Sequence, residues 1–319
     1  MPTVSVVVPV YNGEATLAKT LESILNQTFS DLEVVVIDDG STDGTLAVLS
    51  NFKDPRIKIF SYENGGLPVA RNRGINRATG EFISFIDADD LWSIDKLEQQ
   101  VQALNHHPQA GVAYSWTAFV DEQGEFLYAR ESSYLEGDVY PQLLVRNFIS
   151  SGSNILVRRS VIETVGLFDP QLQSVEDWEY YLRLATHCHF AVVKQHQIFY
   201  RKSSRSMATN IPVMEVASLT VIERSFAKAP AHLQGLKAKS LSNLYRYLAK
   251  QCIGYACRPE ELKVARQKLQ QAIQYYPGTL MQRETQRLMI KVLALSLLPR
   301  HSARSLIELL GDKFPMVRY

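Results

Sequence analysis

The stretch VVVIDDGSTDGT, residues 34–45, decides the fold of this chain. An apolar run ends there in two adjacent carboxylates, Asp38 and Asp39, which are followed by glycine and hydroxyl side chains. A second stretch, FISFIDADD at residues 82–90, is again an apolar run that ends in aspartates. In open parallel sheets, ligands bind beyond the carboxyl ends of the strands. We therefore expect these two acidic strand ends to meet at one edge of a sheet and to form a site.

The segments around both stretches alternate between patterns typical of strands and of helices. Apolar or alternating runs predict strands at 4–8, 34–38, 56–61 and 82–86. Apolar residues at helical spacing predict helices at 16–28, 45–52 and 69–78. This order predicts a parallel sheet covered by helices. Further on, the patterns predict a helix at 93–105, a strand at 112–120, a helix around 177–186 and only helices after residue 213.

The composition is that of an ordered globular protein with an asymmetric charge. Its 319 residues suffice for one large domain with an appendage or for two domains, and 46% are hydrophobic. Residues 1–214 carry 17 Lys+Arg and 26 Asp+Glu, whereas residues 215–319 carry 17 and 7. The basic second part suggests an anionic partner such as a membrane surface. Two solvated surfaces of opposite charge explain the asymmetry equally well.

Several classes of protein are not expected. The three cysteines show no C-x-x-C spacing, so neither a disulfide framework nor a zinc site is indicated. The start, MPTVSVVVPVYN, has no positively charged leader, which favours a cytoplasmic protein without a signal peptide. The longest apolar stretch, 288–299, is shorter than the ~20 residues that span a bilayer. No motif indicates a nucleic-acid partner.

Carboxylates that converge without histidine or cysteine suit a hard divalent cation. Mg²⁺ or Mn²⁺ prefers oxygen ligands and often takes only one or two from the protein, with substrate phosphates completing the set. Arg71, in ARNRG at 70–74, is placed to provide positive charge for phosphate oxygens or to orient a neighbouring aspartate. For Asp43 and Asp90 we favour a simpler interpretation, in which each caps the helix that follows it.

Five motifs in order carry a resemblance to a known family: PVYN (9–12), DDGSTDGT (38–45), ARNRG (70–74), DADD (87–90) and ED (176–177). Together they resemble the family 2 glycosyltransferases, which are inverting enzymes with the GT-A fold that use nucleotide-diphosphate sugars. The resemblance covers roughly residues 3–205. It implies an α/β catalytic domain at 1–212, with a mixed, mostly parallel sheet and flanking helices. An all-helical, basic region would follow at 213–319.

The resemblance implies roles for residues around the nucleotide. By resemblance, Pro9, Tyr11 and Glu14 line the nucleotide pocket. Asp39 accepts a hydrogen bond from the imide N–H of the base, which suits uracil or thymine, and Arg71 supports the nucleotide site. A UDP-linked donor is therefore favoured.

The D-x-D and ED motifs receive the roles closest to the chemistry. The resemblance implies that, in the D-x-D formed by Asp87, Ala88 and Asp89, the first aspartate faces the ribose or donor sugar and the last contacts Mn²⁺ or Mg²⁺. Direct attack by an acceptor hydroxyl needs a general base. The ED motif assigns that role to Asp177, beside Glu176. The alternative is that Asp177 only caps the helix that begins there.

Other residues are expected near the donor sugar or the acceptor. By resemblance, the polar turn that contains Gly152 and Ser153 lies there. Trp178 and Trp92 neighbour the proposed site motifs and could stack on a sugar, whereas core packing is expected for Trp116.

Two features depart from the family pattern. Many relatives carry a histidine after the Tyr-Arg pair that follows the last strand, but this chain has Lys202 and Ser203 there. Either a metal ligand is absent, or the basic run of Arg201, Lys202 and Arg205 holds the diphosphate as a lid. The Q-x-x-R-W motif of processive polysaccharide synthases is also missing, so we expect transfer of a single sugar.

These patterns lead to one hypothesis and two alternatives. The hypothesis is transfer of a sugar to a glycan or lipid-linked acceptor in cell-surface polysaccharide or glycoconjugate synthesis. A sugar-phosphate nucleotidyltransferase would need a Gly-rich loop with a lysine, which PVYNGEAT (9–16) lacks. A catalytically silent nucleotide-sugar-binding scaffold would be favoured by loss of Asp177 or Asp89, and both are present.

The helical region has expectations of its own. One helix pair, at 249–277, is similar to a tetratricopeptide unit. The region would serve for packing, for contact with a second copy of the chain, or for peripheral contact with an anionic membrane.

Overall fold

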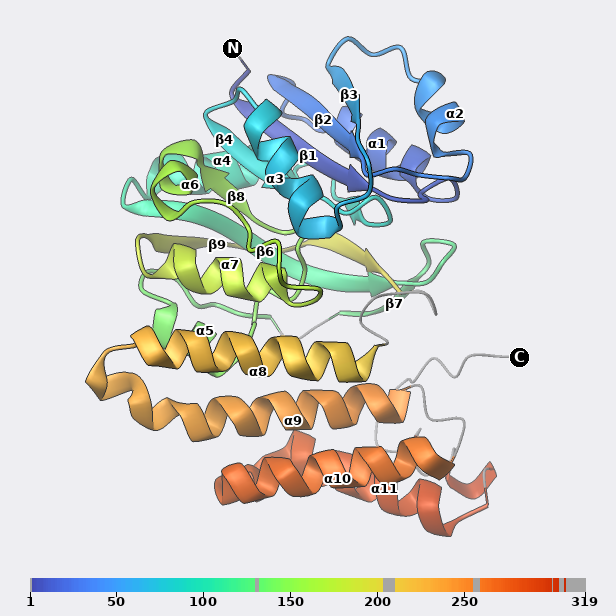
Figure 1. The fold of residues 1–319 in the computed structure, drawn as a ribbon, viewed down its shortest axis with the longest axis vertical. Helices are drawn as coiled ribbons and strands as arrows, with labels where there is room; N and C mark the ends of the chain where they lie inside the picture. The colour runs from blue at the N-terminus through green and yellow to red at the C-terminus, as the bar shows by residue number, and fades with distance from the viewer. Residues whose placement is uncertain are drawn as a thin grey trace. The chain divides into compact units, whose positions relative to one another are not determined.

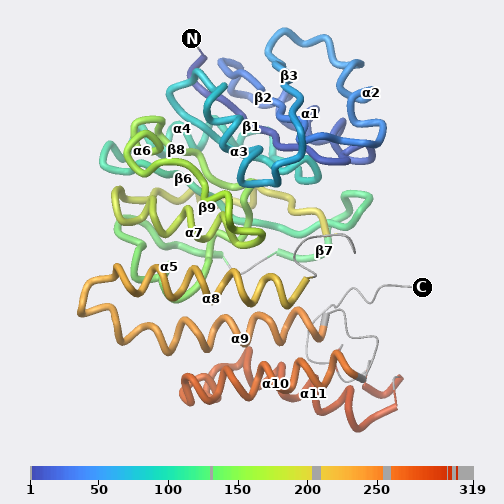
Figure 2. The backbone as a smooth tube through the Cα atoms, in the orientation of Figure 1, coloured from blue at the N-terminus to red at the C-terminus, as the bar shows by residue number. Residues whose placement is uncertain are grey.

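The computed structural model describes residues 2–129, 132–202, 210–254, 259–299, 301–303 and 307 of the chain (Figures 1 and 2). Contacts within the chain divide it into two compact units. The sheet unit comprises Met1–Leu143 and Asn147–Ser203, and the helical unit comprises Leu144–Arg146 and Ser204–Tyr319. Each unit has its own buried apolar core.

The sheet unit contains one nine-stranded sheet, with the order β3-β2-β1-β4-β8-β6-β9-β5 and with β7 paired to β6. Its strands are β1 (Val4–Val10), β2 (Leu32–Asp38), β3 (Ile57–Ser61), β4 (Phe82–Phe85), β5 (Leu91–Trp92), β6 (Ala110–Val120), β7 (Phe126–Ala129), β8 (Leu156–Arg158) and β9 (His189–Arg201). Its helices are α1 (Leu17–Leu25), α2 (Thr45–Ser50), α3 (Leu67–Arg77), α4 (Lys96–His106), α5 (Tyr140–Val145, whose last two residues belong to the helical unit), α6 (Arg159–Val165) and α7 (Glu176–Ala185).

Register places the predicted acidic strand ends at the same edge of the sheet, on either side of β1. The central strand β1 pairs in parallel with β2 on one side and with β4 on the other. Val10 pairs with Asp38 at the end of β2, and Val7 pairs with Phe85 at the end of β4. Every residue of these three strands is buried, which explains why their sequences are nearly continuous apolar runs. The predicted mixed, mostly parallel sheet is confirmed, since β8 joins β4 in antiparallel orientation.

Helices cover both faces of the parallel part of the sheet (Figure 1). On one face, alternate valines of β1 pack with apolar side chains of α1 and α4 in the main core. On the other face, Val35 and Ile37 of β2 pack against Ala70 of α3. Because α3 is held on the sheet in this way, the side chains of its first turns lie at the edge where the strands end.

One expectation in this region is wrong. The helix predicted at 93–105 begins only at Lys96, and its N-cap residue is Asp95 rather than Asp90. The intervening residues Leu91 and Trp92 form β5, which pairs with β9. This two-residue strand depends on a partner about a hundred residues away in sequence, so no local pattern indicates it.

Among the described residues of the helical unit, all the secondary-structure elements are helices, in agreement with the pattern after residue 213. They are α8 (Ile211–Lys228), η2 (Ala231–Leu236), α9 (Lys237–Gly254), α10 (Pro259–Tyr275), η3 (Pro277–Met281) and α11 (Arg283–Leu297). Side chains from α9, α10 and α11 share one apolar core. In the described part of the chain, none of the helices has both the length and the apolar character to cross a membrane. Similarity to a tetratricopeptide unit stays a prediction.

Candidate functional site

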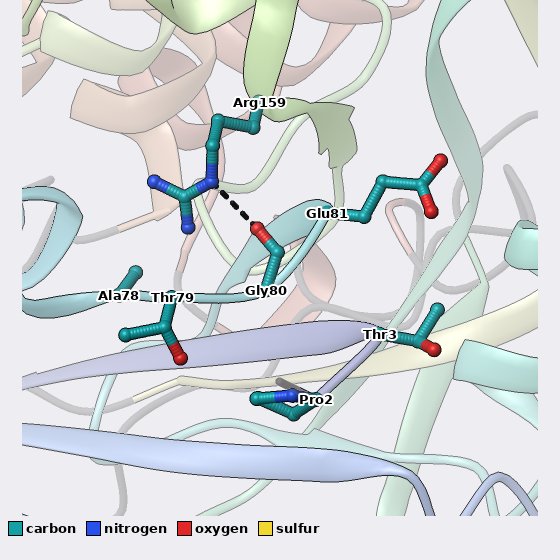
Figure 3. A pocket seen from close by; sticks show the side chains of 7 residues that line it. All are labelled: Pro2, Thr3, Ala78, Thr79, Gly80, Glu81 and Arg159. Carbon is teal, nitrogen blue, oxygen red and sulfur yellow. Dashed lines mark hydrogen bonds between the residues drawn. The ribbon is translucent and has the colours of Figure 1, made fainter.

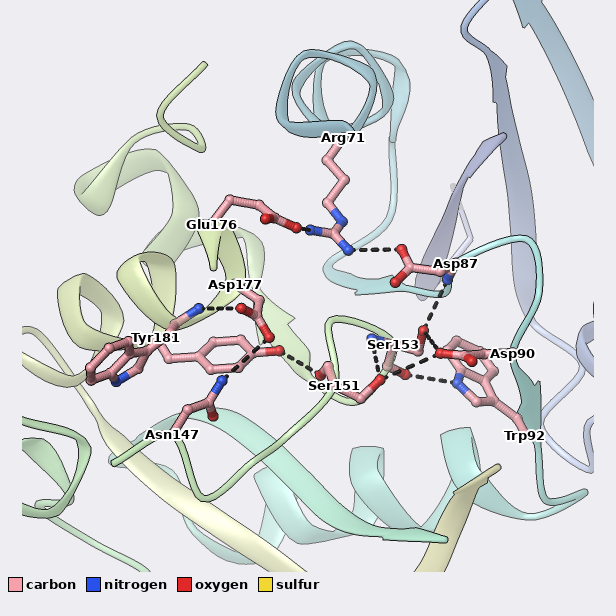
Figure 4. Close-up of polar contacts among 11 residues, drawn as sticks. Arg71, Asp87, Asp90, Trp92, Asn147, Ser151, Ser153, Glu176, Asp177 and Tyr181 are labelled. Carbon is pink, nitrogen blue, oxygen red and sulfur yellow. Dashed lines mark hydrogen bonds and ion pairs between the residues drawn. The ribbon is translucent and has the colours of Figure 1, made fainter. Parts of the chain in front are cut away.

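Arg71 joins the predicted D-x-D motif to the predicted ED motif (Figure 4). Its Nη2 atom donates to Oδ1 of Asp87 at 2.7 Å, and its Nη1 atom donates to Oε1 of Glu176 at 2.6 Å. The Arg71 side chain is only 1% exposed, and Glu176 is 7% exposed. The arginine on α3 therefore holds the end of β4 and the start of α7 together through a buried bridge.

The surroundings of Arg71 fix its guanidinium group. Burial alone would lower the pKa of Arg71, but the charges of Asp87 and Glu176 outweigh it and raise that pKa above its usual range. A Cβ atom at Gly152 would lie 2.3 Å from the Arg71 Nη2 atom, so only glycine fits there. The ring of Phe168 lies 5.4 Å from the guanidinium carbon. Arg71 is thus a fixed positive charge that orients carboxylates.

Asp90 has a structural role that sequence reasoning missed. It is fully buried, and its Oδ2 atom accepts a hydrogen bond from the Ser153 hydroxyl at 2.5 Å. Its Oδ1 atom accepts from the Arg201 backbone N–H at 3.0 Å. Ser153 in turn accepts from the Asp87 backbone N–H at 3.0 Å. Asp90 therefore holds the D-x-D loop in place through Ser153 and the Arg201 backbone and does not cap a helix. Burial raises the pKa of Asp90 well above the usual range.

Asp89 is the carboxylate of the D-x-D motif that remains free for a ligand. It is half-buried, and no other described residue donates a hydrogen bond to its carboxylate. Burial and the charge of Asp87 raise the pKa of Asp89 to about 6, so it is mostly ionised at neutral pH. An ionised oxygen donor with open valences fits Mn²⁺ or Mg²⁺. No cluster of three or more His, Cys, Asp or Glu side chains arranged for a metal occurs among the described residues.

Asp177 lies at the start of α7, and the pKa of its carboxylate is raised. Its Oδ1 atom accepts from the Trp178 backbone N–H at 2.7 Å, and its Oδ2 atom accepts from the Asn147 side chain at 3.3 Å. Burial raises the pKa of Asp177 to about 7, the charge of Glu176 adds to the increase, and Arg71 opposes it. The contact with Trp178 satisfies a first-turn N–H of the helix, while the cap residue itself is Val175. A carboxylate with this pKa can exchange protons at neutral pH.

Two residues that position Asp177 were not predicted. Val175 has φ 55°, a left-handed conformation that is rare for a β-branched side chain and costs about 1–3 kcal/mol. Asn147 has its side-chain oxygen fixed by the backbone N–H groups of Ile149 and Ser150, each at 3.1 Å. Its NH₂ group must therefore be the end that faces Asp177. Neither feature has a signal in the local sequence.

Asp39 lies at the predicted edge, but its carboxylate already has partners. It is 3% exposed and accepts from the backbone N–H groups of Gly65 and Gly66, the latter at 2.8 Å. Arg73 donates to it at 2.6 Å. Asp39 thus anchors the loop before α3. Contact with a base stays a prediction, and it would have to use the lone pairs that these donors leave.

The other residues predicted for the nucleotide differ in exposure. Tyr11 is 55% exposed beyond the end of β1, and Ala88 is half-buried in the D-x-D loop. Pro9 is buried within β1. Glu14 accepts from the backbone N–H of Gly44 at 3.0 Å and so joins the loops after β1 and β2. Asp43, predicted to cap the next helix, accepts from the first-turn N–H of Thr45 at 3.0 Å.

The two tryptophans that were predicted to stack on a sugar have buried side chains. Trp178 is 6% exposed and its indole N–H donates to the Leu143 carbonyl at 2.8 Å. Trp92 is 4% exposed and donates to the Ser153 carbonyl at 2.8 Å. Neither ring is open to a sugar in this structure.

The predicted basic lid falls partly outside the described residues, which include neither Ser203 nor Arg205. Of the run, Arg201 and Lys202 are described. The Arg201 side chain contacts the D-x-D loop, where it donates to the Asp89 carbonyl at 2.8 Å. It also donates to the Glu122 carbonyl at 2.6 Å. Arg201 therefore ties the D-x-D loop to the turn after β6.

A separate hollow lies at the opposite, amino-terminal edge of the strands (Figure 3). It has a volume of about 580 Å³ and is lined by Pro2, Thr3, Ala78, Thr79, Gly80, Glu81 and Arg159. The Arg159 guanidinium donates to the Gly80 carbonyl at 2.7 Å. None of the predicted site residues lines this hollow, so it is distinct from the acidic edge.

Comparison with known proteins finds glycosyltransferases among the similar sequences and structures. An uncharacterized glycosyltransferase of Rickettsia bellii is 34% identical over 190 residues, which is 57% of this chain and 27% of that protein. The putative teichuronic acid biosynthesis glycosyltransferase TuaG of Bacillus subtilis is 36% identical over 140 residues, 41% of this chain and 54% of that protein. This chain thus spans only about a quarter to just over half of these relatives.

A solved structure has the same fold along almost the whole chain. It is Staphylococcus aureus TarS 1–349 in complex with UDP-GlcNAc, with a TM-score of 0.63 and 22% identity. The match covers 96% of this chain and 88% of that one. At this identity the likeness establishes the GT-A fold alone. The model of the family described as glycosyltransferase like family 2 matches residues 5–251, and the chain belongs to that family.

Proposed function

We propose that this chain is an inverting glycosyltransferase that transfers one sugar from a nucleotide-diphosphate donor to an acceptor hydroxyl. The observation that carries the proposal is Asp177, a carboxylate with a pKa of about 7 beside the acidic strand edge. Arg71 joins the segment that bears it to the D-x-D loop. A base and a donor-binding edge held together in this way suit direct displacement at a sugar carbon.

In the proposed reaction, the acceptor oxygen attacks the anomeric carbon as the bond from that carbon to the diphosphate breaks. Asp177 accepts the acceptor's hydroxyl proton through its carboxylate, and Asn147 holds the carboxylate in place. Asp87 contacts the ribose or donor sugar, oriented by Arg71. Because a single displacement occurs from the side opposite the leaving group, the configuration at the sugar carbon inverts.

Asp89 would hold Mn²⁺ or Mg²⁺ together with the donor phosphates. When bound, such a cation stabilises the negative charge on the departing diphosphate. Arg201 keeps the Asp89 backbone in position through its carbonyl.

The donor favoured is UDP-linked and the acceptor a glycan or a lipid-linked glycan. The similarity to TarS, whose structure contains UDP-GlcNAc, supports the first choice. The similarity to TuaG, which is named for teichuronic acid biosynthesis, supports the second. Calorimetric titration with UDP, with and without Mn²⁺ and with GDP as the control, tests the donor site. Absence of binding by both nucleotides would contradict the proposal.

Asp89→Ala should remove the dependence of UDP binding on Mn²⁺, because the variant lacks the carboxylate that remains open for a cation. Calorimetry in both conditions measures the effect. Glu81→Ala is the matched control, because it removes an exposed carboxylate at the other edge of the same sheet. If Mn²⁺ still strengthens UDP binding to Asp89→Ala, Asp89 is not the ligand.

The kcat of the transfer reaction should rise with pH through a midpoint near 7. Burial and the charge of Glu176 raise the pKa of Asp177 to about 7, so its basic form is lost below that pH. Activity should therefore fall by about tenfold per pH unit well below the midpoint. Initial rates at saturating donor and acceptor measure it. A midpoint near 4, the range of an ordinary aspartate, would exclude Asp177 as the base.

Asn147→Ala should lower kcat at neutral pH and move the same midpoint upward, with little change in UDP affinity. The reason is that Asn147 donates to the Asp177 carboxylate and favours its ionised form. Asn147→Asp should lower activity further, since it places a second negative charge there. A loss of UDP affinity equal to the loss of rate would instead indicate a general disturbance of the fold.

A further inference from the structure

One face of α11 is exposed along the whole helix. Five positions of this helix follow one another at intervals of three or four residues and therefore share a face: 283, 287, 290, 293 and 297. We call these side chains the α11 stripe: Arg283, Arg287, Ile290, Leu293 and Leu297. The exposed fraction is 41% at Ile290, 56% at Leu293 and 77% at Leu297. Large apolar side chains gathered on one exposed face mark an interaction surface.

The opposite face of α11 is already in use. Leu288 and Val292 are 2% and 6% exposed and pack in the core of the helical unit with Leu269 of α10. The helix is therefore held in its present rotation, and the α11 stripe cannot turn inward without loss of this core. A partner from outside the described residues is needed to cover it.

The charge of the α11 stripe is positive. Arg283 and Arg287 are exposed, and neither forms an ion pair with another described residue. The acidic side chain of this helix, Glu284, lies toward α9, where it pairs with Arg246 at 3.5 Å and with Lys250 at 3.2 Å. The stripe thus combines three apolar side chains with two arginines and contains no carboxylate.

We propose that the α11 stripe docks the helical unit on an anionic phospholipid surface. Leu293 and Leu297 would enter the boundary between head groups and acyl chains, while Arg283 and Arg287 contact lipid phosphates. The sequence supports this occupant, since residues 215–319 carry 17 Lys+Arg against 7 Asp+Glu. A second copy of the chain fits less well, because a two-fold contact would bring the arginines of both copies together without a carboxylate.

The full chain should sediment with vesicles of phosphatidylcholine and phosphatidylglycerol but much less with phosphatidylcholine alone. Added salt should weaken the binding, because screening reduces the attraction of exposed charges. Two double variants of the α11 stripe should each weaken binding to the anionic vesicles by about tenfold or more. They are Leu293→Ser/Leu297→Ser and Arg283→Gln/Arg287→Gln.

Two matched controls have the same chemistry elsewhere on the helical unit. Val216→Ser removes an apolar side chain of α8 that is 67% exposed. Lys263→Gln/Arg266→Gln removes two exposed positive charges of α10. Both should bind anionic vesicles nearly as well as the parent chain. Equal losses in these controls would mean that only net charge or general hydrophobicity matters and would overturn the proposal.

Three further outcomes would overturn it. The first is absence of binding to anionic vesicles. The second is a dimer in light scattering that Leu293→Ser/Leu297→Ser dissociates, which would assign the stripe to a second copy. The third is a fall of several degrees in the melting temperature of that variant, which would mean that the chain itself covers the stripe. Calorimetric binding of UDP is measured on the same samples, so failure of docking and failure of the proposed donor site remain distinguishable.

Discussion

Asp177→Asn is expected to lower kcat by about three orders of magnitude while UDP binding stays nearly unchanged, because a general base contributes about 10²–10⁴-fold. The amide has the same shape as the carboxylate, and its oxygen can still accept the hydrogen bond from the Trp178 backbone N–H, whereas its NH₂ group cannot accept from Asn147. It cannot take up the acceptor's proton, however. Transfer of radiolabelled sugar to acceptor measures the rate, and calorimetry measures the affinity for UDP.

The control for this variant is Asp138→Asn, the same change at an exposed aspartate of the same unit. It should retain full activity. If Asp177→Asn turns over at the parent rate, another base must be sought. If it loses UDP binding as well as activity, the side chain acts on the donor site and not on the acceptor's proton.

The second large effect concerns the buried bridge of the sheet unit. Arg71→Leu should destabilise this unit by about 3–5 kcal/mol, because two carboxylates would lose their buried partner. Urea unfolding followed by tryptophan fluorescence measures it. The method reports on the sheet unit alone, since the three tryptophans of the chain, Trp92, Trp116 and Trp178, all lie in that unit.

Two comparisons separate charge from packing in this experiment. Arg71→Leu/Glu176→Gln should recover part of the lost stability, because it removes the most deeply buried unpaired charge. Arg77→Leu, an exposed arginine on the same helix, should cost about 1 kcal/mol or less. An Arg71→Leu variant as stable as the parent chain would mean that the bridge adds nothing net to folding.

Three strands of the parallel half of the sheet, β1, β2 and β4, could be predicted because they are buried on both faces. In β1, β2 and β4 every residue is buried, so each strand appears in the sequence as an apolar run without help from its partners. The acidic residues after β2 and β4 were then placed at one edge by the rule for parallel strands. The α/β fold and the acidic edge of the sheet followed from this local information.

The parts that could not be predicted depend on contacts between distant segments. Arg71 and Glu176 are separated by 105 positions, and Asp90 and Arg201 by 111. Nothing near Asp90 distinguishes an N-cap from a buried anchor, because aspartate serves both roles. For the same reason the sequence placed Trp178 beside the site but did not indicate that its ring faces the interior.

The close contact between Gly152 and Arg71 has a consequence for engineering the loop that contains Gly152. Any larger residue at 152 would displace the guanidinium group from its ion pairs with Asp87 and Glu176, so variation at this position disturbs the buried bridge. Ser153 is equally unsuitable, because its hydroxyl is bound to Asp90. Ser150 has a φ of 80°, which favours glycine or asparagine at that position. Substitutions intended to change which donor sugar is accepted should therefore be made in other loops, and the loop that contains Gly152 should be kept unchanged.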